Sequence, residues 1–400
     1  MPHRYADSAT RPPGWLGRKR GYRARPFEWL AEKAIFLVSL SAIVLVFLIF
    51  IFVAREALPV FLGQTNSAAA QETLPATDLQ RLLKENPERL RRYLDVKPEP
   101  FAKMRVETGH ETLKILMEVK EEEGKEAPKD KDARVNTTDW RYLVDAYQWS
   151  GYTKPEYIWQ PISQIHKYNI VPLLIGSLKA TAVALLFAVP ISLGAAIFVS
   201  QLCPPTLKEW LKPGIELLAA IPSVVLGFFA LIVLATLLQK FFGYQSRLNA
   251  FVAGIALGLA VIPVVFSIAE DAFTSVPRAY SQAALALGAT RWQTAWQVVV
   301  PAALPGVFAA VVLGFGRAIG ETMVVLMASG NASIVSASLL DSTRTVTATI
   351  AAELAEAVFG GHHYRILFML GTLLFIVTFC TNWLADAAIH TLKRKLEGKS

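Results

Sequence analysis

The sequence predicts an all-α polytopic membrane protein with six transmembrane helices and a small extracytoplasmic insert. Three observations lead to this fold class. Hydrophobic residues make up 53% of the 400 residues. Six separate apolar runs are long enough to cross a hydrocarbon core of about 30 Å. Basic residues gather just before the first run and just after the last. The net charge of +8 therefore reflects membrane topology, and we exclude nucleic acid as a partner.

The chain begins with a basic tail over residues 1–33, followed by a first transmembrane helix predicted over 34–61. Its charge-free stretch Ala34–Ala54 is too long for the apolar part of a signal peptide, so we expect the helix to be retained. Basic residues precede this helix, and others lie in the C-terminal tail over 389–400. Both ends of the chain are therefore predicted to lie in the cytoplasm.

Residues 62–170 differ from the rest because they are polar, mixed in charge and contain no run that could cross a membrane. We predict one small extracytoplasmic domain here. Within it, Glu111–Val119 is compatible with a strand, and Lys120–Arg134 is nearly all charged and predicts a mobile loop. Asp139–Pro161 is rich in Trp and Tyr, which is typical of residues that pack a small domain or lie at a membrane interface.

A core of five further helices is predicted over residues 171–388, which brings the C-terminus back to the cytoplasm. The five apolar runs are Ala180–Val199, Leu217–Leu238, Ala250–Ala269, Ala302–Met327 and Ile366–Ala385. Pro222 and Gly227 predict a kink in the second of these runs. Alternation across the membrane then gives a cytoplasmic loop over 270–301 and an outside loop over 328–365. The outside loop contains the histidine pair His362 and His363, which could suggest a metal site. Because the loop has no Cys and neither histidine has a partner at i,i+4, we expect a solvated segment instead.

An ion pair is predicted inside the fourth run of this core. Arg317 and Glu321 lie one helical turn apart on the same face, about 6 Å along the axis. Each charge costs roughly 2.5–3.5 kcal/mol at the bilayer centre, so both are expected to face the protein interior or a water-filled path. Two interpretations remain open: a structural pair that locks two helices together, or a site on a translocation path. Gly316 and Gly320, four residues apart, predict close helix packing.

The cytoplasmic loop carries a helix, a glycine stop and a second short helix that we expect to end at Pro301. Gly288 can take the positive φ of a helix end. The segment is too apolar to lie free in the cytosol, so it needs either a partner surface or the membrane face. The residues that define it are Gln282, Ala283, Ala284, Gly288, Arg291, Trp292 and Pro301.

The spacing of this loop resembles the coupling-loop signature of ABC importer permeases. Gly288 follows Gln282 by six positions, and Pro301 follows Gly288 by thirteen. In that family the loop docks on an ATPase subunit. Gln282 stands where the family usually has Glu, so the charge contact of that Glu would be absent here. The resemblance implies a type I ABC importer permease core.

Further runs narrow the resemblance to permeases of the high-affinity phosphate importer, and to the C-type (PstC-like) rather than the A-type (PstA-like) subunit. These runs contain Gly316-Arg317-Ala-Ile-Gly320-Glu321-Thr-Met, Ala220-Ile-Pro222-Ser-Val-Val-Leu-Gly227 and Arg344-Thr-Val-Thr-Ala-Thr-Ile-Ala-Ala-Glu353-Leu. The likeness covers about residues 158–395 and leaves 62–157 outside. In that family, the arginine and glutamate that match Arg317 and Glu321 are implicated in transport.

The resemblance implies a multi-pass permease of the bacterial inner membrane that takes up inorganic phosphate. Its partners would be a homologous second permease (PstA-like), two ATP-binding subunits (PstB-like), an extracytoplasmic phosphate-binding protein (PstS-like) and membrane lipid. No phosphate-binding P-loop occurs in the chain, so we expect no ATPase activity of its own, and no cofactor or metal is predicted. The alternatives are a permease for another oxyanion such as molybdate or sulfate, a proton-coupled secondary transporter that uses Glu321, and a membrane-anchored sensor whose active part is the insert.

Overall fold

The computed structural model describes residues 26–65, 111–118, 135–163 and 165–396, with isolated positions at 83, 87, 90, 94 and 132. The chain forms two units, Met1–Phe52 and Val53–Ser400. The first unit contains most of helix α1 (Pro26–Phe61), whose last residues belong to the second. Among the described residues, six helical segments are long and apolar enough to cross a membrane, which confirms the predicted fold class.

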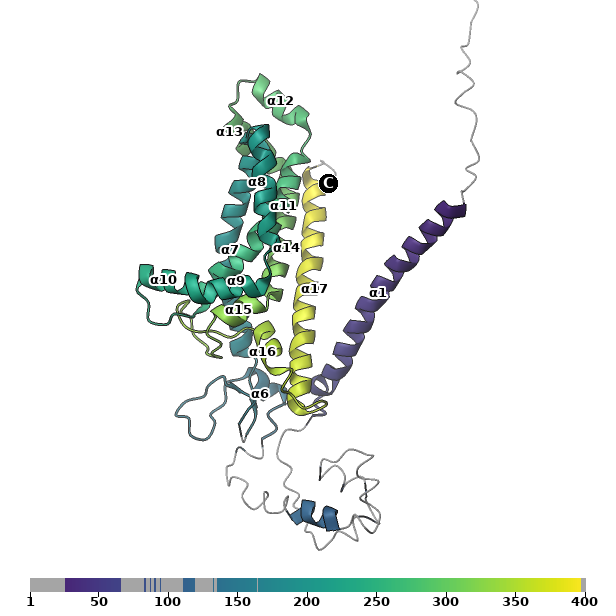
Figure 1. Ribbon diagram of the computed structural model, residues 1–400, viewed down its shortest axis with the longest axis vertical. Coiled ribbons are helices and arrows are strands. Elements are labelled where there is room, and N and C mark those ends of the chain that lie inside the picture. The colour runs from purple at the N-terminus through teal and green to yellow at the C-terminus, as the bar shows by residue number, and fades with distance from the viewer. Residues whose placement is uncertain are drawn as a thin grey trace, which may run out of the picture. The chain divides into compact units, whose positions relative to one another are not determined.

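Helices α7, α11, α14 and α17 run side by side through the second unit (Figure 1). The elements that follow the insert, in chain order, are α7 (Val171–Ile197), the π-helical turn η4 (Phe198–Leu202), α8 (Pro205–Leu217), the short 3₁₀ turn η5 (Leu218–Ala220), α9 (Ser223–Phe229), the π-helical turn η6 (Ala230–Leu234), α10 (Ala235–Phe242), α11 (Ala250–Thr274), α12 (Arg278–Ala286), α13 (Arg291–Thr294), the π-helical turn η7 (Ala295–Val299), α14 (Val300–Gly320), α15 (Met323–Ala328), α16 (Val346–Glu353) and α17 (His362–Leu396).

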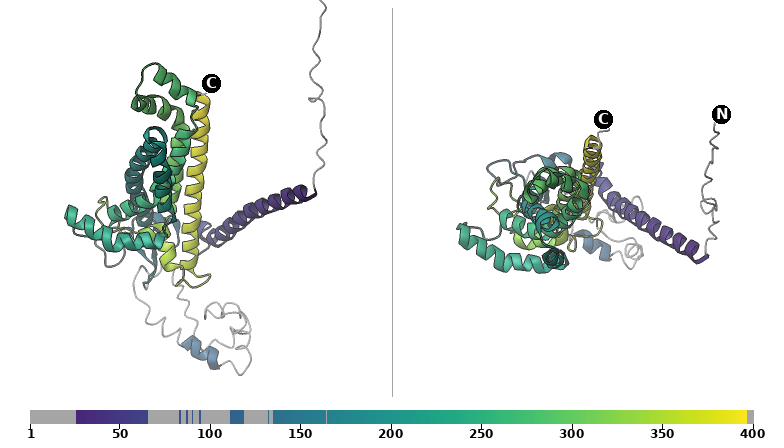
Figure 2. Two further views of the ribbon diagram at one scale, coloured as in Figure 1. Left: turned by 45° about the horizontal axis from the view of Figure 1, so that its top comes forward. Right: turned by 90° about the horizontal axis from the view of Figure 1, so that it is seen from above.

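The two ends of this bundle carry different elements. Helices α12 and α13 lie at the same end as the C-terminal end of α17, while α16 and the short helix α6 (Trp140–Val144) lie at the other (Figures 1 and 2). The loop predicted to be cytoplasmic and the C-terminus of α17 are therefore on one side, as the topology requires.

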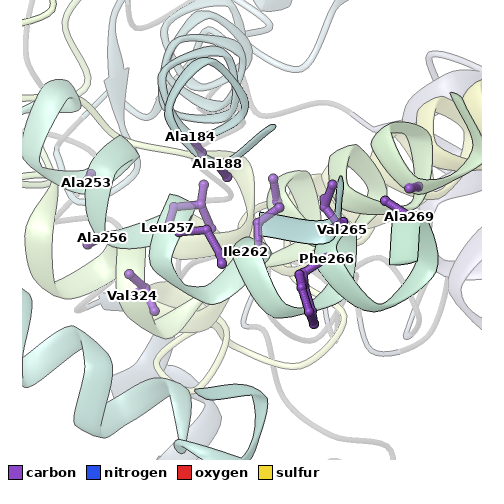
Figure 3. Packing of buried hydrophobic residues seen from close by; sticks show 14 of the residues in the cluster. Ala184, Ala188, Ala253, Ala256, Leu257, Ile262, Val265, Phe266, Ala269 and Val324 are labelled. Carbon is purple, nitrogen blue, oxygen red and sulfur yellow. The ribbon is translucent and has the colours of Figure 1, made fainter. Parts of the chain in front are cut away.

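Helix α11 is the centre of the core because small residues let its neighbours approach closely. A Cβ built at Gly254 would lie 2.4 Å from Cβ of Val183 on α7, and one at Gly314 on α14 would lie 2.5 Å from Cγ2 of Val265 on α11. Around these contacts, alanine, valine, leucine and phenylalanine side chains such as Phe266 form a continuous buried cluster (Figure 3). The N-terminus of α11 is capped by the side chain of Asn249, which accepts from the backbone N–H of Val252 at 2.9 Å.

The predicted span Leu217–Leu238 begins later in the structure than the sequence indicated. The run Leu217–Leu238 was expected to be one kinked helix, but the helix ends before Ile221, whose backbone is extended, and Pro222 is the residue immediately before α9. Proline lacks a backbone N–H and fixes φ, so it suits a helix start better than a helix interior. The residues before the break form α8 and η5. The span itself covers Ser223–Phe242.

The described part of the insert combines short strands with packed aromatic rings. Strand β1 (Trp159–Gln160) pairs antiparallel with β2 (Lys167–Tyr168), with Trp159 opposite Tyr168. The rings of Tyr147 and Trp149 meet edge to face, with centroids 4.8 Å apart. Trp159 and Tyr168 also share a hydrophobic cluster with α17 residues such as Ile366. This part of the insert therefore packs directly on the helical core.

The prediction of a strand over Glu111–Val119 is wrong, because residues 111–118 are helical. Leu113 and Met117 are both fully buried and lie four residues apart, which is the spacing of a helix face rather than of a strand. Lys114 and Glu118 form an ion pair across one turn, at 3.9 Å. The charged segment Lys120–Arg134, apart from Asp132, lies outside the described residues.

Candidate functional site

Helix α14 ends at Gly320, and the helix predicted to continue to Met327 is interrupted. Glu321 has an extended backbone (φ −70°, ψ 134°), and helix resumes only at Met323 in α15. Two hydrogen bonds that the sequence pattern does not predict stabilise this interruption. The Thr347 hydroxyl donates to the Glu321 carbonyl at 2.9 Å, and the Glu321 carboxylate accepts from the backbone N–H of Thr322 at 3.1 Å. The predicted continuous span Ala302–Met327 is therefore wrong at its outer end.

Arg317 and Glu321 form the predicted pair, but their environments differ. The Arg317 guanidinium and the Glu321 carboxylate are 3.7 Å apart, and 51% of the Arg317 side chain is exposed against 9% for Glu321. Arginine offers five N–H donors, more than one carboxylate at this distance can satisfy. Glu321 thus offsets the charge of Arg317 while leaving donors open to an anion. The position of Arg317 in the last turn of α14 also places its charge at the negative end of the helix dipole.

A cavity of about 550 Å³ opens beside this helix end. Its walls come from the end of α14, the residue before α15, and helices α16 and α17. The lining residues are Gly320, Thr322, Thr347, Ile350, Ala351, Leu354, Ala355 and Leu374. Gly320, Thr322 and Thr347 directly neighbour or contact Glu321. The pair therefore lies next to a space with an apolar wall and two threonine hydroxyls.

The two glycines beside the pair make no tight helix contact within the described chain. A Cβ at Gly316 would lie 3.8 Å from the Asn382 side chain of α17, which is ordinary contact, and one at Gly320 would meet nothing within 4 Å. The close approaches on α14 are at Gly306, against Ala272, and at Gly314, against Val265. Close helix packing at Gly316 and Gly320 stays a prediction.

The loop between α11 and α14 matches the expected helix–glycine–helix pattern, with one exception. Gly288 follows α12 with φ +89°, a left-handed conformation that glycine adopts at low cost. Thr290 and Gln293 then form a capping box that starts α13. Pro301 does not end the second helix: it lies in the first turn of α14, where its missing N–H is tolerated, and Arg291–Gly320 forms one long helical segment.

The same loop presents an unusually apolar surface. Leu287 is 90% exposed and Trp292 is 58% exposed, and the ring of Trp292 meets that of Trp296 edge to face at 5.7 Å. Gln282, Ala283 and Arg291 are exposed beside them, and Ala284 is half-buried. Exposed apolar residues of this size and density mark an interaction surface.

Comparison with known proteins now decides the family. Residues 188–394 match the family model of the binding-protein-dependent transport system inner membrane component. The chain belongs to this family. The match includes Pro222, the 282–301 segment and Arg317–Glu321, and excludes the insert.

The relatives of this permease are similar over more than half of its length. A probable ABC transporter permease protein, YqgH of Bacillus subtilis (strain 168), is 36% identical over 55% of this chain and 72% of its own. The phosphate transport system permease protein PstC of Mesorhizobium japonicum is 36% identical over the same two shares, and that of Haemophilus influenzae is 36% identical over 56% and 76%. The chain is thus a membrane-embedded ABC importer permease, and its predicted PstC-like character is confirmed.

This permease has a second buried ion-pair cluster, around Glu353, that the sequence did not predict. Glu353, the last residue of α16, is 7% exposed. One carboxylate oxygen lies 2.8 Å from the Arg344 guanidinium and the other 3.3 Å from Nε2 of His363. The indole N–H of Trp159 donates to both oxygens, at 3.1 and 3.2 Å. Burial raises the pKa of the Glu353 carboxyl, and the charge of Arg344 acts in the opposite direction.

This cluster corrects the prediction of a solvated segment at His363. The side chain of His363 is only 20% exposed, and its ring stacks on Tyr168 at 5.8 Å. His362 is exposed at the start of α17. Among the described residues, no group of three or more His, Cys, Asp or Glu side chains is placed to hold a metal ion. The clue in the sequence was a lone Glu in the apolar run Ala-Thr-Ile-Ala-Ala-Glu353-Leu, which needs a buried partner.

A third ionic cluster lies between α8 and α11. Glu270 is 1% exposed and accepts from the ammonium groups of Lys208 at 2.7 Å and Lys212 at 2.6 Å. The Thr274 hydroxyl donates to the same carboxylate at 3.0 Å. These bonds fasten α8 to the part of α11 that leads into the α12–α13 segment.

Proposed function

We propose that this permease is the transmembrane subunit of an ATP-driven importer of inorganic phosphate, and that it forms the anion path together with a second, homologous permease. The observation that carries the proposal is Arg317, a permanent cation that is half exposed and only loosely paired with a buried carboxylate. A guanidinium keeps its proton and presents a planar fork of donors that matches phosphate oxygens. The curated PstC relatives support phosphate as the anion.

In the mechanism we propose, Glu321 holds the charge of Arg317 while the path is empty and gives way when the anion arrives. The Thr322 hydroxyl at the neighbouring cavity, whose bond to the Gly320 carbonyl is long at 3.4 Å, can turn to donate to a phosphate oxygen. The exposed face of Arg317 would meet residues of the second permease. ATP hydrolysis by two partner subunits, docked on the surface around Leu287 and Trp292, would drive alternating access through the helix Arg291–Gly320. An extracytoplasmic phosphate-binding protein would deliver the substrate.

We further propose that the chain lies in a bacterial inner membrane with both termini in the cytoplasm. The described residues contain six spans, an even number, and the C-terminal end of α17 lies on the same side as α12 and α13, which supports this orientation (Figure 1). Because the coupling surface must face the cytoplasmic ATPase subunits, the termini then share that side.

The decisive experiment is ATPase activity of the assembled complex in liposomes, with the binding protein on the outer side. Phosphate together with binding protein should stimulate hydrolysis and uptake, and molybdate or sulfate should not. If molybdate or sulfate stimulates hydrolysis and phosphate does not, that anion is the substrate instead of phosphate. Uptake that persists without ATP and collapses with the proton gradient would contradict an ATP-driven importer.

A further inference from the structure

Helix α16 touches the insert at one end. Its last residue, Glu353, accepts the indole N–H of Trp159 with both carboxylate oxygens, at 3.1 and 3.2 Å. Trp159 is 2% exposed and belongs to strand β1 of the insert. The neighbouring backbone is also tied down, because Asn169 donates its N–H to the Ile158 carbonyl at 3.0 Å and its side-chain amide to the Asp145 carbonyl at 2.8 Å.

At its other end, α16 touches the candidate anion site. The Thr347 hydroxyl donates to the backbone carbonyl of Glu321 at 2.9 Å. Thr345 caps the helix by accepting from the N–H of Ala348, and the Ser177 hydroxyl of α7 accepts from the N–H of Val346 at 3.0 Å. Thr347 and Glu353 are six residues apart, roughly 9 Å along the axis and on different sides of the helix. A capped helix of eight residues joins the two contacts.

We propose that Glu353 is a positioning residue through which the extracytoplasmic insert sets the geometry of the Arg317–Glu321 site. Trp159 and Arg344 hold Glu353 in place, α16 carries that position to Thr347, and Thr347 fixes the extended backbone at Glu321. The proposal deepens the function assigned above and rests on it for the meaning of the site, while the mechanical link can be tested without phosphate. It also gives the insert, which lies outside the family match, a role in transport.

The mechanical link is tested by hydrogen–deuterium exchange on the full complex in lipid nanodiscs, without phosphate. Trp159→Phe removes the indole N–H while keeping an aromatic ring. Because a hydrogen bond to a charged group is lost, amide exchange in a peptide covering 318–326, which includes the Thr322 N–H bonded to Glu321, should become about tenfold faster. Thr347→Val removes the hydroxyl at the other end with little change in volume and should have the same effect.

Trp140→Phe is the matched control. Trp140 lies in the same insert, and its indole N–H donates to the Phe61 carbonyl at 3.4 Å instead of to α16. Exchange over 318–326 should stay unchanged in this variant. If Trp159→Phe and Thr347→Val leave that exchange at the wild-type rate, or if Trp140→Phe accelerates it equally, the proposed link through α16 is overturned.

The transport consequence is measured separately as phosphate-stimulated ATPase activity. Trp159→Phe and Thr347→Val should each raise the KM for phosphate about tenfold, and the double variant should add little, since both changes break the same link. Fully additive effects, or losses that only follow the amount of assembled complex, would reduce Trp159 to a stabilising role. If exchange responds but Arg317→Ala transports normally, the link stands and the proposed function of the site fails.

Discussion

Arg317 is the side chain whose replacement separates a transport site from a structural lock. Arg317→Ala removes the fixed charge and should abolish phosphate uptake while the complex still assembles, because half of this side chain is exposed. Arg317→Lys keeps the charge but loses the planar fork, and uptake should fall about tenfold or more. Uptake of labelled phosphate by proteoliposomes measures both effects.

Arg247→Ala is the control for this pair of variants, since Arg247 is exposed and lies outside the candidate site. It should transport like the wild type. A complex that fails to assemble with Arg317→Ala would restore the structural interpretation, and normal uptake by Arg317→Ala would remove Arg317 from the path.

Glu321→Gln tests the partner of the pair. The amide oxygen can still accept from the Thr322 N–H, so the helix end should persist, but Arg317 loses its counter-charge. Phosphate should bind more tightly and leave more slowly, lowering both KM and kcat about two- to fivefold in phosphate-stimulated ATP hydrolysis. If a proton gradient drives uptake by the wild type but not by Glu321→Gln, Glu321 is instead favoured as a proton carrier.

The pair at Arg317 and Glu321 was predictable because helical spacing alone brings the two side chains together. The break at Glu321 was not, because it depends on a hydroxyl from Thr347, which is distant in sequence. The Glu353 cluster was missed for the same reason: Trp159, Arg344 and His363 reach Glu353 from three separate segments. Local patterns predict which helices form, whereas polar contacts between segments need the folded chain.

Packing between α7 and α11 makes Gly254 sensitive to a single added carbon. In Gly254→Ala, the new Cβ would lie 2.4 Å from Cβ of Val183 and 3.1 Å from the backbone carbonyl of Ala180, neither of which can move freely. The resulting overpacking should cost about 1–3 kcal/mol and lower the midpoint of thermal unfolding. Gly194→Ala on α7 meets nothing within 4 Å and should leave the midpoint unchanged or raise it slightly. Equal midpoints for the two variants would contradict the close approach.

The contact between α8 and α11 predicts a loss of stability in alkali. The hydrogen bond to Glu270 raises the pKa of Lys212 above its ordinary value. The protonated lysine contributes its full stabilisation at pH values below its pKa in the unfolded chain, about 10.4. This stabilisation is lost as the pH rises through the higher pKa of the folded chain. Thermal unfolding followed between pH 8 and pH 12 should therefore show a smaller alkaline loss in Lys212→Gln. Lys240→Gln, which replaces an exposed lysine on α10, should keep the wild-type profile.

One helical segment joins the proposed coupling surface around Leu287 and Trp292 to the candidate anion site. Arg291–Gly320 spans 30 residues, or about 45 Å, from the exposed loop at one end of the bundle to Arg317 near the other. Pro301 and Pro305 are accommodated without ending the segment, so a displacement at α13 has a direct path to α14. This continuity depends on the position of Pro301 in the first turn of α14. From the sequence pattern, Pro301 was expected to end a helix.

The surface around Leu287 should therefore control both assembly and activity. Leu287→Asp places a charge on a side chain that is 90% exposed, so the fold of this chain should survive, while docking on an apolar groove of an ATPase subunit should be lost. Co-purification of the ATP-binding subunits and phosphate-stimulated ATP hydrolysis should both fall at least tenfold. Val358→Asp changes an exposed residue at the opposite end of the bundle and should leave co-purification intact. If Leu287→Asp retains its ATPase subunits but binds vesicles more weakly, α12 lies on lipid and the docking assignment is wrong.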